Sequence, residues 1–96
     1  MLDKLTHEAF EQRLGEHVDF EWADVQFSAV IDEVTKMTQQ AGQERVPFSV
    51  IFLVAGSDNH GQHLFHASHP HLGEFPLFLV PIGPGEKGMR YEAVFT

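Results

Sequence analysis

Five histidines lie within twelve consecutive positions, and they form the densest group of potential metal ligands in the chain: His60, His63, His66, His69 and His71. Neutral imidazole is a common ligand for zinc, copper and nickel, so the cluster suggests a histidine-based metal-binding or pH-responsive module. In an extended strand, however, His63 and His66 point to opposite faces, and Pro70 separates His69 from His71. No carboxylate lies between His60 and Gly73 to complete a ligand set. We therefore expect solvated loop histidines and keep the metal or pH-responsive module as the alternative.

Other candidate catalytic groups lack the surroundings that their chemistry requires. Three serines are candidate nucleophiles: Ser49, Ser57 and Ser68. None stands in a Gly-x-Ser-x-Gly elbow. Asp32-Glu33 and Asp58 are typical of a solvated face or turn rather than of a paired acid and base. The segment Gly83–Gly88 resembles a phosphate loop in composition, but it lacks Gly-Lys-Ser/Thr and leads into an expected strand. We expect no enzymatic activity and no cofactor.

Charge and composition exclude several classes of partner. Six Lys and Arg residues against fourteen Asp and Glu residues give a net charge of −8, which repels phosphate backbones and anionic lipids. We therefore expect neither nucleic acid nor membrane binding. The chain has no cysteine. It also shows neither a signal peptide nor an apolar stretch of the roughly 18 residues that span a membrane, so we expect a cytoplasmic protein.

The elements that would position these groups begin with a short helix over about Thr6–Leu14. Thr6 is the expected N-cap, Leu5 and Phe10 fit a hydrophobic staple, and Phe10 and Leu14 would form the buried stripe. Alternating apolar residues then predict six strands: Val18–Trp22, Val25–Ile31, Phe48–Val54, His63–Ala67, Phe75–Ile82 and Met89–Phe95. The expected fold is one mainly β domain over residues 1–96 (α+β by count), with antiparallel strands forming a small barrel or sandwich.

Two of these strands are apolar on both faces. Val50–Val54 and Leu77–Val80 each require cover on two sides, which one short helix cannot supply for a flat sheet. A closed barrel or sandwich would meet this demand, and so would a protein interface. The interface candidates are therefore Leu77, Phe78, Leu79 and Val80.

Aromatic residues on the expected strands are assigned to the core by their alternation: Phe20, Trp22, Phe27 and Phe52. The last strand should form a hairpin with the one before it, because a glycine-rich connection joins them. On that strand Tyr91 shares a face with Met89, Ala93 and Phe95 and should be buried, with a hydrogen-bond partner for its hydroxyl. Arg90 and Glu92 should face outward.

Several strings resemble a small bacterial family classed as a domain of unknown function. They are Leu5-Thr6-x-x-x-Phe10, Pro47–Phe52, His69-Pro70-x-Leu72-Gly73-Glu74, Leu77–Gly83 and the terminal Met89–Phe95. Genes of that family often lie beside those of phage-tail-collar-like proteins, so the resemblance implies an accessory or assembly role. Together with the two-faced strands, it favours a non-enzymatic protein-binding or assembly module that has a protein partner or self-associates.

Overall fold

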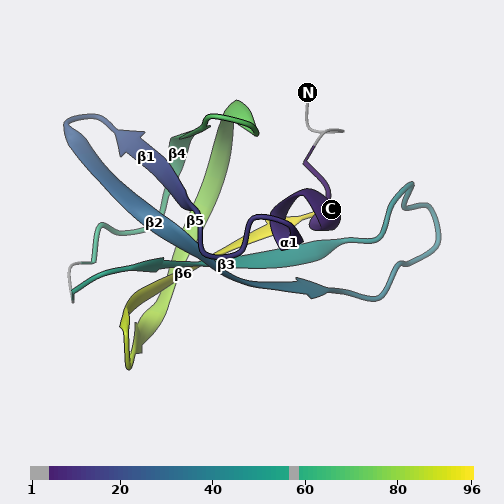
Figure 1. The fold of residues 1–96 in the computed structure, drawn as a ribbon. Coiled ribbons are helices and arrows are strands. Elements are labelled where there is room, and N and C mark those ends of the chain that lie inside the picture. Colours follow the sequence, from purple (N-terminus) through teal and green to yellow (C-terminus); the bar gives the residue numbers. More distant parts are fainter. Residues whose placement is uncertain (1–4, 57–58) are drawn as a thin grey trace.

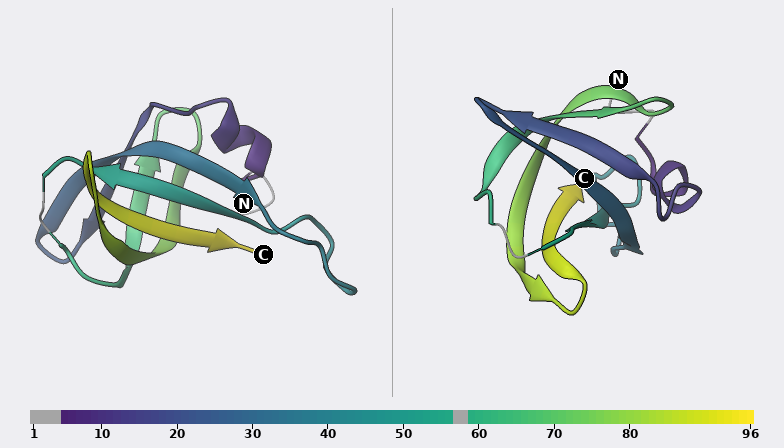
Figure 2. Two further views of the ribbon diagram at one scale, coloured as in Figure 1. Left: turned by 90° about the horizontal axis from the view of Figure 1, so that it is seen from below. Right: turned by 60° about the vertical axis from the view of Figure 1, so that its left-hand side comes forward.

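Six antiparallel strands close into a barrel beside one short helix in the computed structural model, which describes residues 5–56 and 59–96 (Figure 1). The elements are α1 (His7–Glu11), β1 (His17–Trp22), β2 (Val25–Lys36), β3 (Phe48–Val54), β4 (His63–His69), β5 (Gly73–Gly85) and β6 (Gly88–Phe95). Around the barrel the order is β1-β2-β3-β6-β5-β4, with β4 returning to pair with β1 (Figure 2). The mainly β fold is confirmed, and the structure selects a barrel over a sandwich.

Helix α1 is shorter than the sequence predicted. Thr6 is its N-cap, and the Thr6 side chain accepts a hydrogen bond from the backbone N–H of Ala9 at 3.1 Å. The helix ends at Glu11, because the chain then turns and the N–H of Gly15 donates to the carbonyl of Ile31 in β2 at 2.8 Å. The expected burial of Leu14 is therefore wrong: it lies in this turn and is 52% exposed.

Phe10 connects α1 to the barrel core. Its ring lies 5.2 Å from that of Phe95, 6.1 Å from Phe48 and 6.4 Å from Phe52, measured between ring centroids. All four side chains are buried. The helix therefore packs on aromatic residues of β3 and β6, and Leu5, which precedes it, is buried in the same cluster.

Barrel closure covers one face of every strand, but the outer faces differ. In β3 the outward Ser49 and Ile51 are buried as well as the inward residues, so the expected two-sided cover is found there. In β5 the outward Phe78 is 46% exposed, so barrel closure supplies the expected cover on only one face of that strand. Trp22 is also exposed rather than in the core, because it is the last residue of β1 before the turn to β2.

The hairpin of β5 and β6 is confirmed, with a tighter turn than expected. β5 continues through a register shift between Pro81 and Gly83 as far as Gly85, so that only Glu86 and Lys87 form the turn. Gly88 approaches β3 so closely that a Cβ atom there would lie 2.2 Å from the carbonyl oxygen of Val54.

Tyr91 is fully buried, as predicted, and its hydroxyl accepts a hydrogen bond from the backbone N–H of His60 at 2.7 Å. Met89, Ala93 and Phe95 are buried on the same face, and Arg90 and Glu92 on the other face are half-buried. The predicted register of β6 is confirmed. Within the described part of the chain, no helix is long and apolar enough to cross a membrane.

Candidate functional site: an acidic groove beside an apolar patch

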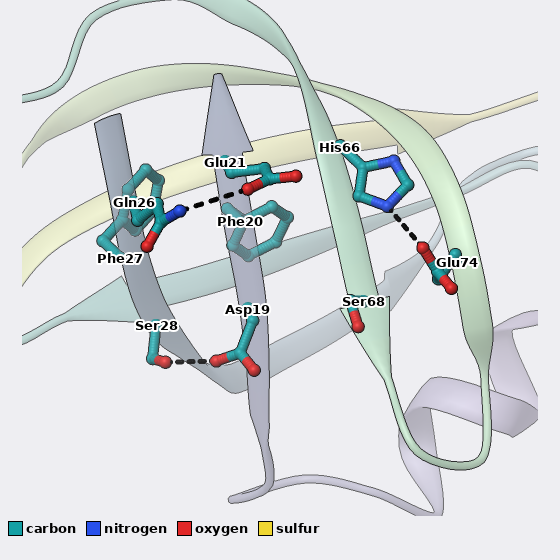
Figure 3. Close-up of a pocket in the computed structure, with 9 residues that line it drawn as sticks. All are labelled: Asp19, Phe20, Glu21, Gln26, Phe27, Ser28, His66, Ser68 and Glu74. Atoms are coloured by element: carbon teal, nitrogen blue, oxygen red, sulfur yellow. Dashed lines mark hydrogen bonds and ion pairs between the residues drawn. The ribbon is translucent and has the colours of Figure 1, made fainter. Parts of the chain in front are cut away.

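A shallow groove of about 430 Å³ runs across the outer surface of β2, β1, β4 and β5 (Figure 3). We call it the acidic groove, and its lining is Asp19, Phe20, Glu21, Gln26, Phe27, Ser28, His66, Ser68 and Glu74. Strand register places the polar residues in two rows that cross the sheet: Ser28, Asp19, Ser68 and Glu74 in one, and Gln26, Glu21 and His66 in the other. Asp19 and Glu21 face outward because they alternate with the buried Val18 and Phe20.

The polar side chains of the acidic groove are held by hydrogen bonds between neighbouring strands. The Ser28 hydroxyl donates to Asp19, and Gln26 Nε2 donates to Glu21 Oε2 at 3.3 Å. His66 Nε2 contacts Glu74 Oε1 at 2.8 Å (Figure 3). Asp19 and Glu21 thus bond to neutral groups. The lining contains three carboxylates and neither lysine nor arginine, so the groove attracts positive charge.

The five histidines of the cluster do not converge on one site, and most of them contact different neighbours. His60 stacks on Phe27 with ring centroids 4.3 Å apart, and His63 stacks on Trp22 at 3.7 Å. His66 lies in the acidic groove, and the backbone N–H of His71 donates to His69. Within residues 5–56 and 59–96, no three His, Asp or Glu side chains converge in an arrangement that could hold a metal ion.

His69 is buried and links the β4–β5 turn to the segment before β1. Its Nδ1 accepts hydrogen bonds from the backbone N–H groups of His71 and Leu72 at 3.0 and 3.1 Å. Nε2 therefore carries the proton and donates to Glu16 Oε1 at 2.7 Å. This hydrogen bond, with a further contribution from the nearby Arg13, lowers the pKa of Glu16 from its usual 4.5.

The other candidate catalytic residues do not gather into one site. Ser49 is buried on β3, whereas Ser68 lines the acidic groove. Asp32 lines a second, smaller hollow together with Lys87 and Arg90 at the β5–β6 hairpin, and Glu33 is exposed on β2. Ser57 and Asp58 lie outside the described residues.

Next to the acidic groove, the same outer surface is apolar. Leu64 on β4 pairs directly with Phe78 on β5, and these outward side chains are 60% and 46% exposed. Val80 follows Phe78 on the same face and is half-buried. We call these three residues the outer apolar patch: Leu64, Phe78 and Val80.

The patch alters the set of interface candidates taken from the sequence. Leu77 and Leu79 point into the barrel and are buried in its core, so they are excluded as surface contacts. Phe78 and Val80 lie on the outside, where Leu64 joins them. Sequence reasoning missed Leu64, because only strand pairing brings it beside Phe78. It also missed the acidic groove, although the polar alternation of Asp19 and Glu21 with apolar residues already signalled an outward polar face.

Comparison with known protein families identifies the family of this chain. No curated protein and no solved structure resembles the chain significantly. A family described as a domain of unknown function (DUF6916) matches residues 5–95, which include every strand of the barrel and α1. The chain therefore belongs to the DUF6916 family of domains of unknown function.

Proposed function

We propose that this protein is a non-enzymatic protein-binding module and that the outer apolar patch is its docking surface. The observation that carries the proposal is the exposed cross-strand pair of Leu64 and Phe78. Fully burying a side chain of this size stabilises an interface by about 1.5–3 kcal/mol relative to leaving it in water. Large apolar side chains that meet on one surface are typical of binding sites, whereas single exposed ones are common anywhere.

The closed barrel also restricts how a partner can bind. Every strand pairs with two neighbours, so among the described residues the sheet offers no free edge along its paired segments for an added strand. A partner must therefore contact side chains on the outer surface. The outer face of β4 and β5 provides such a surface on hydrogen-bonded strands.

The acidic groove supports a binding role more than a catalytic one. Within the described residues, His66 hydrogen-bonds to Glu74 and to no serine, and Asp19 bonds to Ser28 with no histidine between them. A nucleophile, a base and an orienting acid are thus not in contact. An accessory role beside a phage-tail-like protein and a cytoplasmic location belong to the same proposal; the first rests on the family resemblance, and the second on the sequence.

The test compares capture of partners from the source cells by two matched double variants. Leu64→Ser/Phe78→Ser removes the centre of the patch, whereas Leu14→Ser/Met37→Ser removes two exposed apolar side chains elsewhere. Cross-linking followed by mass spectrometry should identify a protein that the wild type and the control variant capture and that the patch variant loses about tenfold or more. Thermal melting would establish that both variants are folded. Identical capture by all three proteins would refute the proposal.

A further inference from the structure

The outer apolar patch and the acidic groove form one continuous surface. On β4, Leu64 and His66 are two residues apart and face the same way, and on β5 the same holds for Phe78 and Pro76, followed by Glu74. The paired strands thus carry Leu64 and Phe78 at one end of this face and His66 and Glu74 at the other, where β1 adds Asp19 and Glu21 beside β4. A partner that covers Leu64 and Phe78 along the strands also reaches the groove.

Two of the three groove carboxylates have neutral hydrogen-bond partners, whereas the third, Glu74, contacts His66. Asp19 is held by Ser28 and Glu21 by Gln26, which are neutral groups, and no ion pair within the described residues joins either carboxylate to a lysine or arginine. Both carboxylates are exposed. The net charge of −8 adds a long-range field of the same sign.

A second copy of this chain is a poor complement to this surface. Two copies that each carry a charge of −8 repel one another. The cations at the far end of β5, Lys87 and Arg90, share their hollow with Asp32 and Glu86, so that end supplies no net positive charge. Charge complementarity therefore favours a different protein with basic residues.

We infer that the partner is a protein whose docking segment places apolar side chains on Leu64 and Phe78 and lysine or arginine side chains in the acidic groove. This inference rests on the proposed function, and it adds the chemistry of the partner. The apolar contacts would supply affinity. The charges of the acidic groove, at the edge of the interface, would mainly steer the encounter and select among partners.

The experiment uses a library of short random peptides displayed on phage, selected against the full-length protein at low salt. Enriched peptides should combine apolar residues with lysine or arginine and carry a net positive charge. Their binding should weaken as salt rises, because exposed charges are screened.

Two variants with equal net charge then locate the effect. Asp19→Asn/Glu74→Gln removes two carboxylates from the groove, whereas Glu44→Gln/Glu86→Gln removes two exposed carboxylates elsewhere. For a fluorescently labelled enriched peptide, the groove variant should raise the dissociation constant about five- to tenfold, and the control less than about twofold. Phe78→Ser should abolish measurable binding of the same peptide.

The outcomes separate this inference from the proposed function. Enriched peptides that need Phe78 but carry no excess of lysine and arginine, or that bind both double variants equally, would overturn the basic partner and leave the docking surface intact. Peptides whose binding is indifferent to Phe78→Ser would overturn both.

Discussion

Replacing Tyr91 tests the register on which the interior and exterior of the barrel depend. Tyr91 is fully buried, its ring lies 5.7 Å from that of Phe27, and its hydroxyl accepts the N–H of His60. Truncating a buried aromatic side chain costs about 3–5 kcal/mol of unfolding free energy, and Tyr91→Ala should fall in this range. Tyr91→Phe keeps the ring and removes only the hydroxyl, so it should cost about 1–2 kcal/mol.

The neighbouring residue supplies the matched control. Arg90 points to the other face, its Nε has no hydrogen-bond partner among the described residues, and its side chain lies over Gly85. Arg90→Ala breaks no hydrogen bond of Nε in the described part of the chain and shortens a side chain that is only half-buried, so it should cost about 1 kcal/mol or less. A small domain has about 5–15 kcal/mol of stability in total, so Tyr91→Ala should leave the protein close to unfolding while Arg90→Ala leaves it intact.

Urea titration followed by the fluorescence of the single tryptophan, Trp22, measures these differences. With a slope of about 1–3 kcal/mol per molar urea, the midpoint for Tyr91→Ala should fall by at least about 1 M, and that for Arg90→Ala should fall far less. If Arg90→Ala lowers the midpoint more than Tyr91→Ala does, the assignment of inner and outer faces on β6 is wrong.

Three further predictions follow from the contacts of single residues. Gly88→Ala should destabilise the protein by about 3 kcal/mol or more, because the added Cβ would lie 2.2 Å from the carbonyl oxygen of Val54. Thermal melting followed by circular dichroism measures this loss, and an unchanged melting temperature would contradict it. The pKa of Glu16 is lower in the folded state than its usual 4.5, so its contribution to stability is complete above pH 4.5 and is lost as the pH falls through the folded pKa. Glu16→Gln should therefore make the free energy of unfolding less dependent on pH below 4.5, as urea titrations at several pH values would show. If the free energy of unfolding falls equally steeply with pH in the variant and the wild type, Glu16 does not have this role. Thr6→Ala removes the side chain that caps α1 and should cost about 1 kcal/mol, which thermal melts can detect, while Thr6→Ser, which keeps the hydroxyl, should cost little.

The sequence alone predicted the elements whose signals are local. The change from a capped helical segment to residues alternating with period two predicted α1 and the strands, and the positions of glycine and proline predicted the turns between them. Alternation also assigned Tyr91 to the core and Arg90 to the outside, because successive side chains on a strand point to opposite faces.

Local pattern was a poorer guide at the ends of elements. Leu14 has helical spacing from Phe10, but the chain turns there to pair with β2, and Trp22 has the parity of a core residue but lies where β1 ends. In both cases the burial of a side chain depends on whether another element covers that position. An alternating sequence carries no information about its neighbours.

The candidate site depends on tertiary structure for the same reason. Leu64 lies on β4, Phe78 and Glu74 lie on β5, and Asp19 lies on β1. Only the order and register of the strands bring Leu64 beside Phe78 and place the three groove carboxylates on one surface. Composition and periodicity thus determined a small acidic β domain with a short helix. Barrel closure decided which apolar residues are left on the outside, because it buries one face of each strand and pairs strands that are distant in sequence.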